Sequence, residues 1–136
     1  MTVVEYRRTK AFSGEELAAL FRSVGWFSAA YPDQLQTAMR NSGHVISAWD
    51  GDRLVGLIRG MDDGAWQAVI DCLLVDPAYQ GRGIASALLE TLMEEYRDFL
   101  YVSVTPEEKK NVSFYEQRGF SVMEEGIPLQ RRGRWD

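Results

Sequence analysis

The chain has 136 residues, of which 46% are hydrophobic, and its 15 basic and 20 acidic residues leave a net charge of −5 at pH 7. A chain of this length and composition buries one sizeable core, so we expect a single domain over residues 1–136. The acidic balance and the lack of an apolar run of about eighteen residues argue against binding to nucleic acid or to a membrane. No signal-peptide pattern opens the chain, and we therefore expect a cytoplasmic protein.

Cysteine and histidine occur once each, as Cys72 and His44. One cysteine cannot form an intrachain disulfide and one histidine excludes a His-based cluster, so no metal is expected. Cys72 lies in an apolar run without a nearby His or Lys, which favours a buried small hydrophobic residue over a nucleophilic thiol. The sequence leaves the oligomeric state open, with a homodimer among the alternatives.

Two helices are predicted in the first part of the chain, after a short strand at residues 3–6. The first helix begins at the capping box Ser13-Gly14-Glu15-Glu16 and continues with apolar residues at helical spacing until Gly25. Pro32 opens the second helix, which we expect to run to about Met39. Four aromatic residues nearby either wall an acceptor pocket or pack the core: Trp26, Phe27, Tyr31 and Trp49.

Strands are predicted in the middle of the chain. Residues 45–49 and 54–58, joined by Asp50-Gly51-Asp52, are typical of a β-hairpin. Residues 66–75 form a long apolar run that ends before Pro77. Such a run predicts a central strand that is covered on both faces.

Helices and strands alternate in the second half of the chain. The segment from Ile84 to Tyr96 carries the apolar stripe of a third helix, and residues 99–104 are the next predicted strand. A short helix at residues 111–118 and a last strand at residues 120–123 follow. This order suits an α+β domain built around a mostly antiparallel sheet.

A glycine-rich turn joins the long apolar strand to the third helix, in the stretch from Leu73 to Ala85. Gly81 and Gly83 let the backbone approach a ligand closely, and Arg82 adds a cation. The free N–H groups and the positive end of the helix dipole favour an anion at such a turn. The alternative is an ordinary left-handed turn at a strand–helix junction.

Two common phosphate-binding motifs are excluded at this turn. A P-loop needs a lysine followed by Ser or Thr, and neither occurs at those places. A dinucleotide fingerprint needs a third glycine, where this chain has Ser86, and a later acidic residue that residues 100–104 lack.

The turn resembles a known family signature. Gln80-Gly81-Arg82-Gly83-Ile84-Ala85 resembles the Q/R-x-x-G-x-G/A motif of the GCN5-related N-acetyltransferases. Leu73-x-Val75-x-Pro77 is similar to that family's fourth strand, and Asn111…Phe114-Tyr115…Gly119-Phe120 to its C-terminal motif. The resemblance covers roughly residues 43–123. The chain departs from the common pattern at Ala85, where glycine is more usual, and in a shorter stretch between Asn111 and Tyr115.

The resemblance implies a fold and a cofactor site. The family has a mixed, mostly antiparallel sheet flanked by helices, with parallel fourth and fifth strands that part around coenzyme A. The N–H groups from Gly81 to Ala85 and the Ser86 hydroxyl would bind the pyrophosphate. The backbone of Leu73, Leu74 and Val75 would pair with the pantetheine arm, although these residues also fit a core strand.

The resemblance also implies an activity. Members of the family transfer an acetyl group from acetyl-coenzyme A, as co-substrate, to the primary amine of a small molecule or peptide, by direct attack in a ternary complex. The alternative from another class is a non-catalytic acyl-coenzyme A sensor on the same fold. A nucleotide-binding module is disfavoured by the missing P-loop lysine.

Three further residues are candidates for the chemistry. By resemblance, Tyr115 protonates the leaving thiolate, although it also fits a core aromatic residue. Asn111 by resemblance hydrogen-bonds the coenzyme, and its alternative is a helix N-cap. Asp71 is a lone carboxylate in an apolar strand, so it either binds or deprotonates the amine or pairs with an arginine such as Arg59. Four other acids remain as alternative bases: Asp62, Asp63, Glu124 and Glu125.

Overall fold

The computed structural model describes residues 3–135, and its contacts divide these residues into two compact units. The first unit ends at Val104 and the second begins at Thr105. The single domain expected over residues 1–136 stays a prediction. Within the described range, no helix has both the length and the apolar character needed to cross a bilayer.

Within residues 3–135, the first unit contains five strands and three α-helices, and the second contains one α-helix. In chain order the first unit holds β1 (Glu5–Arg7), α1 (Gly14–Ser23), η1 (Phe27–Ala30), α2 (Pro32–Asn41), β2 (His44–Asp50), β3 (Arg53–Asp62), β4 (Gln67–Val75), η2 (Pro77–Tyr79), α3 (Ile84–Glu95) and β5 (Tyr101–Val104). The second unit holds η3 (Lys109–Asn111) and α4 (Val112–Glu116).

Local sequence signals explain where α1 and α2 begin. The Ser13 hydroxyl accepts a 3.0 Å hydrogen bond from the Glu16 amide, and the Glu16 carboxylate accepts a 2.7 Å bond from the Ser13 amide. This reciprocal pair satisfies two amides that the first turn of a helix leaves without partners. Pro32 occupies the first position of α2, where its missing N–H costs nothing. Both starts agree with the sequence prediction.

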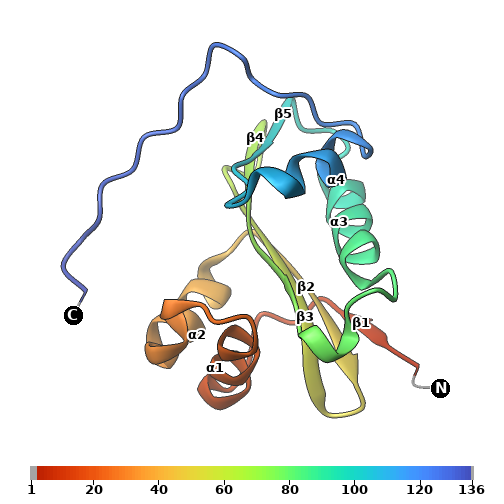
Figure 1. Cartoon of the computed structure of the whole chain (residues 1–136), viewed down its shortest axis with the longest axis vertical. Coiled ribbons are helices and arrows are strands. Elements are labelled where there is room, and N and C mark those ends of the chain that lie inside the picture. Colours follow the sequence, from red (N-terminus) through yellow and green to blue (C-terminus); the bar gives the residue numbers. More distant parts are fainter. Residues whose placement is uncertain (1–2, 136) are drawn as a thin grey trace. The chain divides into compact units, whose positions relative to one another are not determined.

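The five strands form one sheet in the order β1-β2-β3-β4-β5. The first four strands pair antiparallel, and β4 and β5 pair parallel. Figure 1 shows α1 and α2 on one side of the sheet and α3 on the other. The mixed, mostly antiparallel sheet predicted from the sequence is therefore confirmed.

The core of the first unit fills both sides of this sheet. On the side of α1 and α2, aromatic and aliphatic residues pack together, with Phe12 stacked on Trp49 at 6.1 Å between ring centroids. On the other side, Gly56 on β3 lies under α3, and a Cβ built there would stand 3.1 Å from Ile84 Cγ2. Gly56 thus allows α3 to approach the sheet closely. The buried residues of α3 are Ile84, Leu88, Leu89 and Leu92.

Two predictions about strands were wrong. The long strand β4 is the fourth of five strands and lies beside the edge strand β5, so it is not central. It is also not covered on both faces, because Val69 is 43% exposed. Its first half alternates, with Ala68 and Ile70 buried, as in a strand covered on one face. Residues 120–123 form no strand, because they pair with none of the strands in residues 3–135 and an extended segment needs a ladder partner.

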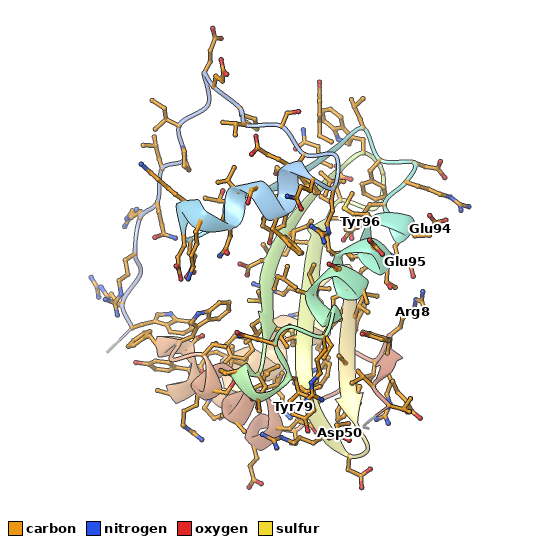
Figure 2. All side chains as sticks on the ribbon, turned by 45° about the vertical axis from the view of Figure 1, so that its right-hand side comes forward. Arg8, Asp50, Tyr79, Glu94, Glu95 and Tyr96 are labelled. Carbon is orange, nitrogen blue, oxygen red and sulfur yellow. The ribbon has the colours of Figure 1, made fainter. Side chains whose placement is uncertain are left out.

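The buried carboxylate of Asp62, at the end of β3, hydrogen-bonds Tyr96 at the end of α3. Asp62 is 7% exposed in its side chain, and its Oδ2 accepts a 2.8 Å hydrogen bond from the hydroxyl of Tyr96 and lies 3.1 Å from His44 Nδ1. The Gly64 amide donates to Oδ1 at 2.8 Å. Burial opposes ionisation, but the hydrogen bonds from Tyr96 and His44 outweigh it and lower the pKa of Asp62. Figure 2 places Tyr96 at the end of α3 beside Glu95.

Replacing this carboxylate should therefore cost stability in a pH-dependent way. We expect Asp62→Asn to lower the free energy of unfolding by about 1.5–3 kcal/mol at pH 7, the range for hydrogen bonds to a charged group. Because the folded-state pKa is lowered, the stabilisation is complete above the unfolded value of about 3.9 and is lost as the pH falls through the folded value. Urea unfolding from pH 7 down to pH 3 should show the difference from wild type shrinking below about pH 4.

The matched control is Asp98→Asn, because the Asp98 side chain is 92% exposed. This variant should unfold like the wild type across the same pH range. An Asp62→Asn protein with wild-type stability at pH 7 would contradict the assignment.

Candidate functional site

The glycine turn leads from the end of β4 through η2 to the start of α3. Gly81 and Gly83 have φ angles of 79° and 80°, in the left-handed region that favours glycine. Gly83 is the N-cap of the 12-residue helix α3, and no side chain caps its first amides. A Cβ built on either glycine meets no atom within 4 Å, so the space in front of both is open. The turn offers the N–H groups and the positive dipole end of α3, and a ligand has room to reach them, so it suits an anion.

Seven predicted cofactor residues meet in or next to this turn. Gln80, Gly81, Arg82 and Gly83 are exposed, whereas the Ile84 side chain is buried in the core, so Ile84 offers only its backbone to a ligand. Ala85 and Ser86 follow in the first turn of α3 and are half-buried.

Hydrogen bonds hold the approach to the turn in place. Gln80 donates from Nε2 to the carbonyl of Val75 at 3.0 Å, which ties the turn back to the end of β4. Asp76 accepts at Oδ1 from the Ala78 amide at 2.9 Å, which caps η2. A turn fixed in this way loses little conformational freedom when a ligand binds.

The ring of Tyr79 makes a cation–π contact with Arg82. The guanidinium of Arg82 lies 5.0 Å from the Tyr79 ring centroid, and that of Arg53 lies 5.5 Å from it. The buried Tyr79 donates its hydroxyl to Asp50, its neighbour in Figure 2. Sequence reasoning missed these partners because Asp50 ends β2 and Arg53 begins β3, far from Tyr79 in the chain. Tyr79 directly precedes the Gln80–Ala85 motif, and this position was the available signal.

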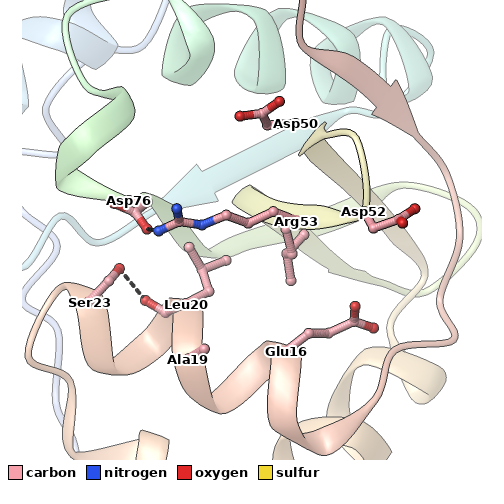
Figure 3. Close-up of a pocket in the computed structure, with 9 residues that line it drawn as sticks. Glu16, Ala19, Leu20, Ser23, Asp50, Asp52, Arg53 and Asp76 are labelled. Atoms are coloured by element: carbon pink, nitrogen blue, oxygen red, sulfur yellow. Dashed lines mark hydrogen bonds and ion pairs between the residues drawn. The ribbon is translucent and has the colours of Figure 1, made fainter. Parts of the chain in front are cut away.

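An acidic pocket lies beside this network. It has a volume of about 590 Å³ and lies between α1, the β2–β3 turn and the end of β4. Figure 3 shows Arg53 crossing it to Asp76, where Nη2 and Oδ2 are 2.9 Å apart. Because carboxylates dominate its wall, the pocket repels phosphates, and the turn remains the better anion site. Its charged lining residues are Glu16, Asp50, Asp52, Arg53 and Asp76.

The short strand β5 pairs along its whole length, but it covers only the first part of the longer strand β4. Their pairing runs from Gln67 with Tyr101 to Ile70 with Val104. Asp71, Leu74 and Val75 pair with β3 on one edge, and in the described part of the chain no strand covers the other edge of residues 71–75. Leu74 and Val75 are buried and build the core, while the second edge of their backbone pairs with no strand in residues 3–135. Both sequence interpretations of residues 73–75 are compatible with this arrangement.

A β-bulge marks the point where this edge opens. Leu57 faces Leu74 and Arg59 faces Asp71, so β4 contains one extra residue between these pairs. Cys72 lies there with a φ of 57°, the one non-glycine residue with positive φ between residues 3 and 135. Such a bulge bends its strand and redirects nearby side chains. The sequence carries no signal for it.

The thiol of Cys72 is kept protonated at this bulge. Burial, and next the neighbouring Asp71 carboxylate, raise the pKa of Cys72 to about 12. Cys72 is partly buried and free. A thiol with this pKa is a poor nucleophile at neutral pH, in line with the structural role expected from the sequence.

Asp71 forms an ion pair with Arg59, which was the structural alternative to a role in the reaction. Arg59 donates from Nη2 to Asp71 Oδ2 at 2.7 Å and from Nε to the same oxygen at 3.1 Å. The Asp71 side chain is nevertheless 45% exposed. The pairing explains how a carboxylate is tolerated in this strand. A role for Asp71 in the reaction stays a prediction.

The two remaining candidates belong to the second unit. The Tyr115 side chain is buried against Phe114 and Phe120, with ring centroids 5.2 Å and 5.5 Å away. Burial raises the pKa of Tyr115, so the phenol holds its proton at neutral pH. Asn111 is exposed before α4 and makes no capping hydrogen bond, so the alternative as a side-chain cap is not realised. The roles of both residues towards the coenzyme stay predictions.

Most of the other residues considered have structural partners. Asp63 accepts hydrogen bonds from the amides of Ala65, Trp66 and Gln67, and Asp62 holds Tyr96. Among the aromatic residues, Trp26 packs edge-on against Phe21, and Trp49 stacks on Phe12. Residues 3–135 contain no group of three or more His, Cys, Asp or Glu side chains arranged to hold a metal ion.

Comparisons with known proteins show which family this chain resembles. Residues 12–120 match the model of the acetyltransferase (GNAT) family. Histone acetyltransferase TAP1 of Glycine max is 33% identical, over 82% of this chain and 53% of its own. GCN5-related N-acetyltransferase 2, chloroplastic, of Arabidopsis thaliana is 35% identical, over 82% of this chain and 51% of its own. This chain thus spans about half the length of these two relatives.

Solved structures share the fold. A GNAT-family acetyltransferase from Streptococcus pneumoniae TIGR4 superposes with a TM-score of 0.83 and 29% identity, over 98% of this chain and 100% of its own. An acetyltransferase from Trypanosoma brucei has a TM-score of 0.72 over 95% of this chain and 100% of its own. At 22% identity, the second likeness supports the fold alone.

Proposed function

Because this chain belongs to the acetyltransferase (GNAT) family, we propose that it transfers an acetyl group from acetyl-coenzyme A to a primary amine. The neutral amine nitrogen attacks the thioester carbonyl, a C–N bond forms and the C–S bond breaks. The amine loses a proton, and the departing thiolate gains one to give coenzyme A. Transfer is direct, within a complex that holds both substrates.

The observation that carries this proposal is the open glycine turn at the start of α3. Two left-handed glycines and the uncapped amides of α3 offer backbone donors to a pyrophosphate. The backbone edge of residues 71–74, which pairs with no strand in residues 3–135, offers hydrogen bonds to an extended pantetheine arm, as an added strand would use them. The reacting thioester would then lie near the bulge, where β4 and β5 stop pairing.

The proposed proton transfers use residues outside the turn. Tyr115 donates a proton to the leaving sulfur, and its raised pKa keeps that proton in place until it is needed. Asp71 attracts the ammonium of the acceptor, since its carboxylate is half-exposed at the bulge. The net charge of −5 favours cationic amines, on a small molecule or on a peptide.

Asp71→Asn tests the role of the carboxylate towards the amine. We expect kcat/KM for the amine to fall about 10- to 100-fold, because a hydrogen bond to a charged group contributes about 1.5–3 kcal/mol. The KM for acetyl-coenzyme A should not change, and high pH should restore part of the rate because more amine is already neutral. Release of the coenzyme A thiol measures the reaction, with Asp98→Asn as the exposed control.

The rival function is a sensor that binds acyl-coenzyme A without transfer. A thermal-shift screen with coenzyme A and with ATP, followed by thiol release with a panel of amines, separates the alternatives. Stabilisation by coenzyme A without thiol release from any amine would favour the sensor, and stabilisation by ATP alone would favour a nucleotide-binding module. A cytoplasmic location and a homodimer stay predictions, and the Arabidopsis thaliana relative is chloroplastic by name.

A further inference from the structure

We propose that Arg59 is a positioning residue for the acceptor amine. It holds Asp71 by one carboxylate oxygen and leaves the other oxygen for the ammonium. This inference rests on the proposed function, and it adds a residue on β3 that acts only through its partner on β4.

The hydrogen bonds of the pair are asymmetric. Arg59 and Asp71 are direct cross-strand partners, so their side chains share one face of the sheet. Nη2 and Nε of Arg59 both donate to Asp71 Oδ2, at 2.7 Å and 3.1 Å. The thiol of Cys72 donates to the same oxygen at 3.1 Å. Three donors thus occupy Oδ2, whereas no hydrogen bond to Oδ1 comes from residues 3–135.

Burial separates the roles of the two partners. The Arg59 side chain is 16% exposed and the Asp71 side chain is 45% exposed. The Asp71 side chain is therefore the more accessible partner for a ligand. Burial opposes the charge of Arg59, but the neighbouring Cys72 and Asp71 outweigh it and raise the pKa of Arg59. Arg59 is thus a permanent cation in a fixed place.

Arg59 is also held from its other side. Its Nη1 lies 3.4 Å from the hydroxyl of Ser42, which is buried and donates at 2.7 Å to the carbonyl of Ala38 in α2. The chain of contacts runs from α2 through β3 to β4. A side chain held at several nitrogens has one orientation, and it transmits that orientation to Asp71.

Asp71 lies at a position in the sheet where a fixed carboxylate could orient the acceptor amine. It directly follows Ile70, the last residue of β4 that pairs with β5, and directly precedes the bulge at Cys72. Asp71 therefore lies at the position in β4 where the pairing with β5 ends. An ammonium needs an acceptor at a defined position, because the nitrogen must reach the thioester carbonyl to within near-attack distance.

The test compares three variants of Arg59. The acceptor is the primary amine with the highest kcat/KM among alkyl diamines, aralkylamines and lysine peptides. We expect Arg59→Met to raise the KM for this amine about tenfold, since a charge-assisted pair that orients Asp71 is lost. Arg59→Lys should restore part of the loss. Arg59→Gln, which donates hydrogen bonds without charge, should lie between them, and the Kd for coenzyme A should stay constant in all three.

A double-mutant cycle shows whether Arg59 acts through Asp71. In the Asp71→Asn background, Arg59→Met should raise the amine KM no further. Arg8→Met is the control, because it breaks an ion pair of 2.6 Å with Glu95 on the surface and should leave the amine KM unchanged. Calorimetric titration of the amine into the coenzyme A complex gives the same comparison without turnover.

The outcomes separate this inference from the proposed function. Thiol release by the wild type with an unchanged amine KM in Arg59→Met would overturn the positioning role and leave the function standing. An amine KM for Arg59→Gln below that of the wild type would also overturn it. Removing the positive charge would then strengthen amine binding, so Arg59 would only offset the charge of Asp71. Amine binding without thiol release would remove the transfer reaction, while calorimetry would still decide on Arg59. A lower melting temperature of the Arg59 variants with an unchanged amine KM would assign Arg59 a structural role.

Discussion

A Gly83→Val protein should lose coenzyme A binding by a factor of at least about 100 while it remains folded. Gly83 has a φ of 80°, and a Cβ built there points into open space rather than into a neighbour. The new side chain would occupy the space through which a pyrophosphate approaches the amides of α3. Losing two hydrogen bonds to a charged group, at about 1.5–3 kcal/mol each, accounts for the expected factor.

Backbone strain must be separated from this loss of access. A side chain in the left-handed region costs roughly 1–2 kcal/mol wherever it occurs. Gly64 has a φ of 75° and equally open surroundings, but it lies in the β3–β4 turn. Gly64→Val therefore carries the same strain and should bind coenzyme A as the wild type does. Titration calorimetry and melting temperature measure both effects, and equal affinity of Gly83→Val and wild type would remove the turn from the site.

Tyr115→Phe should slow turnover by about 10²- to 10⁴-fold, the usual contribution of a general acid. Only the hydroxyl is removed, so the packing against Phe114 and Phe120 is retained and the Kd for coenzyme A should not change. Because burial raises the pKa of Tyr115 above its ordinary value of 10.0, the wild-type rate should fall only at a pH above that value.

The control for this variant is Tyr101→Phe on β5, since Tyr101 is 61% exposed. The decisive measurement is single-turnover thiol release at saturating substrates, which reports the chemical step itself. A wild-type rate for Tyr115→Phe under these conditions would exclude Tyr115 as the proton donor. A reduced affinity for coenzyme A together with a lower melting temperature would assign it to packing.

Several features of this protein were predictable from the sequence because short-range interactions determine them. The capping box at Ser13, the start of α2 at Pro32 and the glycine turn before Ile84 each depend on residues a few positions apart. The Gln80–Ala85 motif also identified the acetyltransferase family, which the match over residues 12–120 confirms. The turn could be placed before α3 because one peptide segment contains all of its backbone donors.

Only the tertiary structure decided how distant residues meet. The pairs Arg59–Asp71 and Asp50–Tyr79 lie 12 and 29 positions apart, and strand register alone brings the first pair face to face. The bulge at Cys72 follows from a mismatch between β3 and β4, which neither strand reveals by itself. Residues 120–123 have the composition of a strand but no ladder partner in the described chain. Helix caps and turns are completed within one segment, whereas a strand and an ion pair each need a second segment.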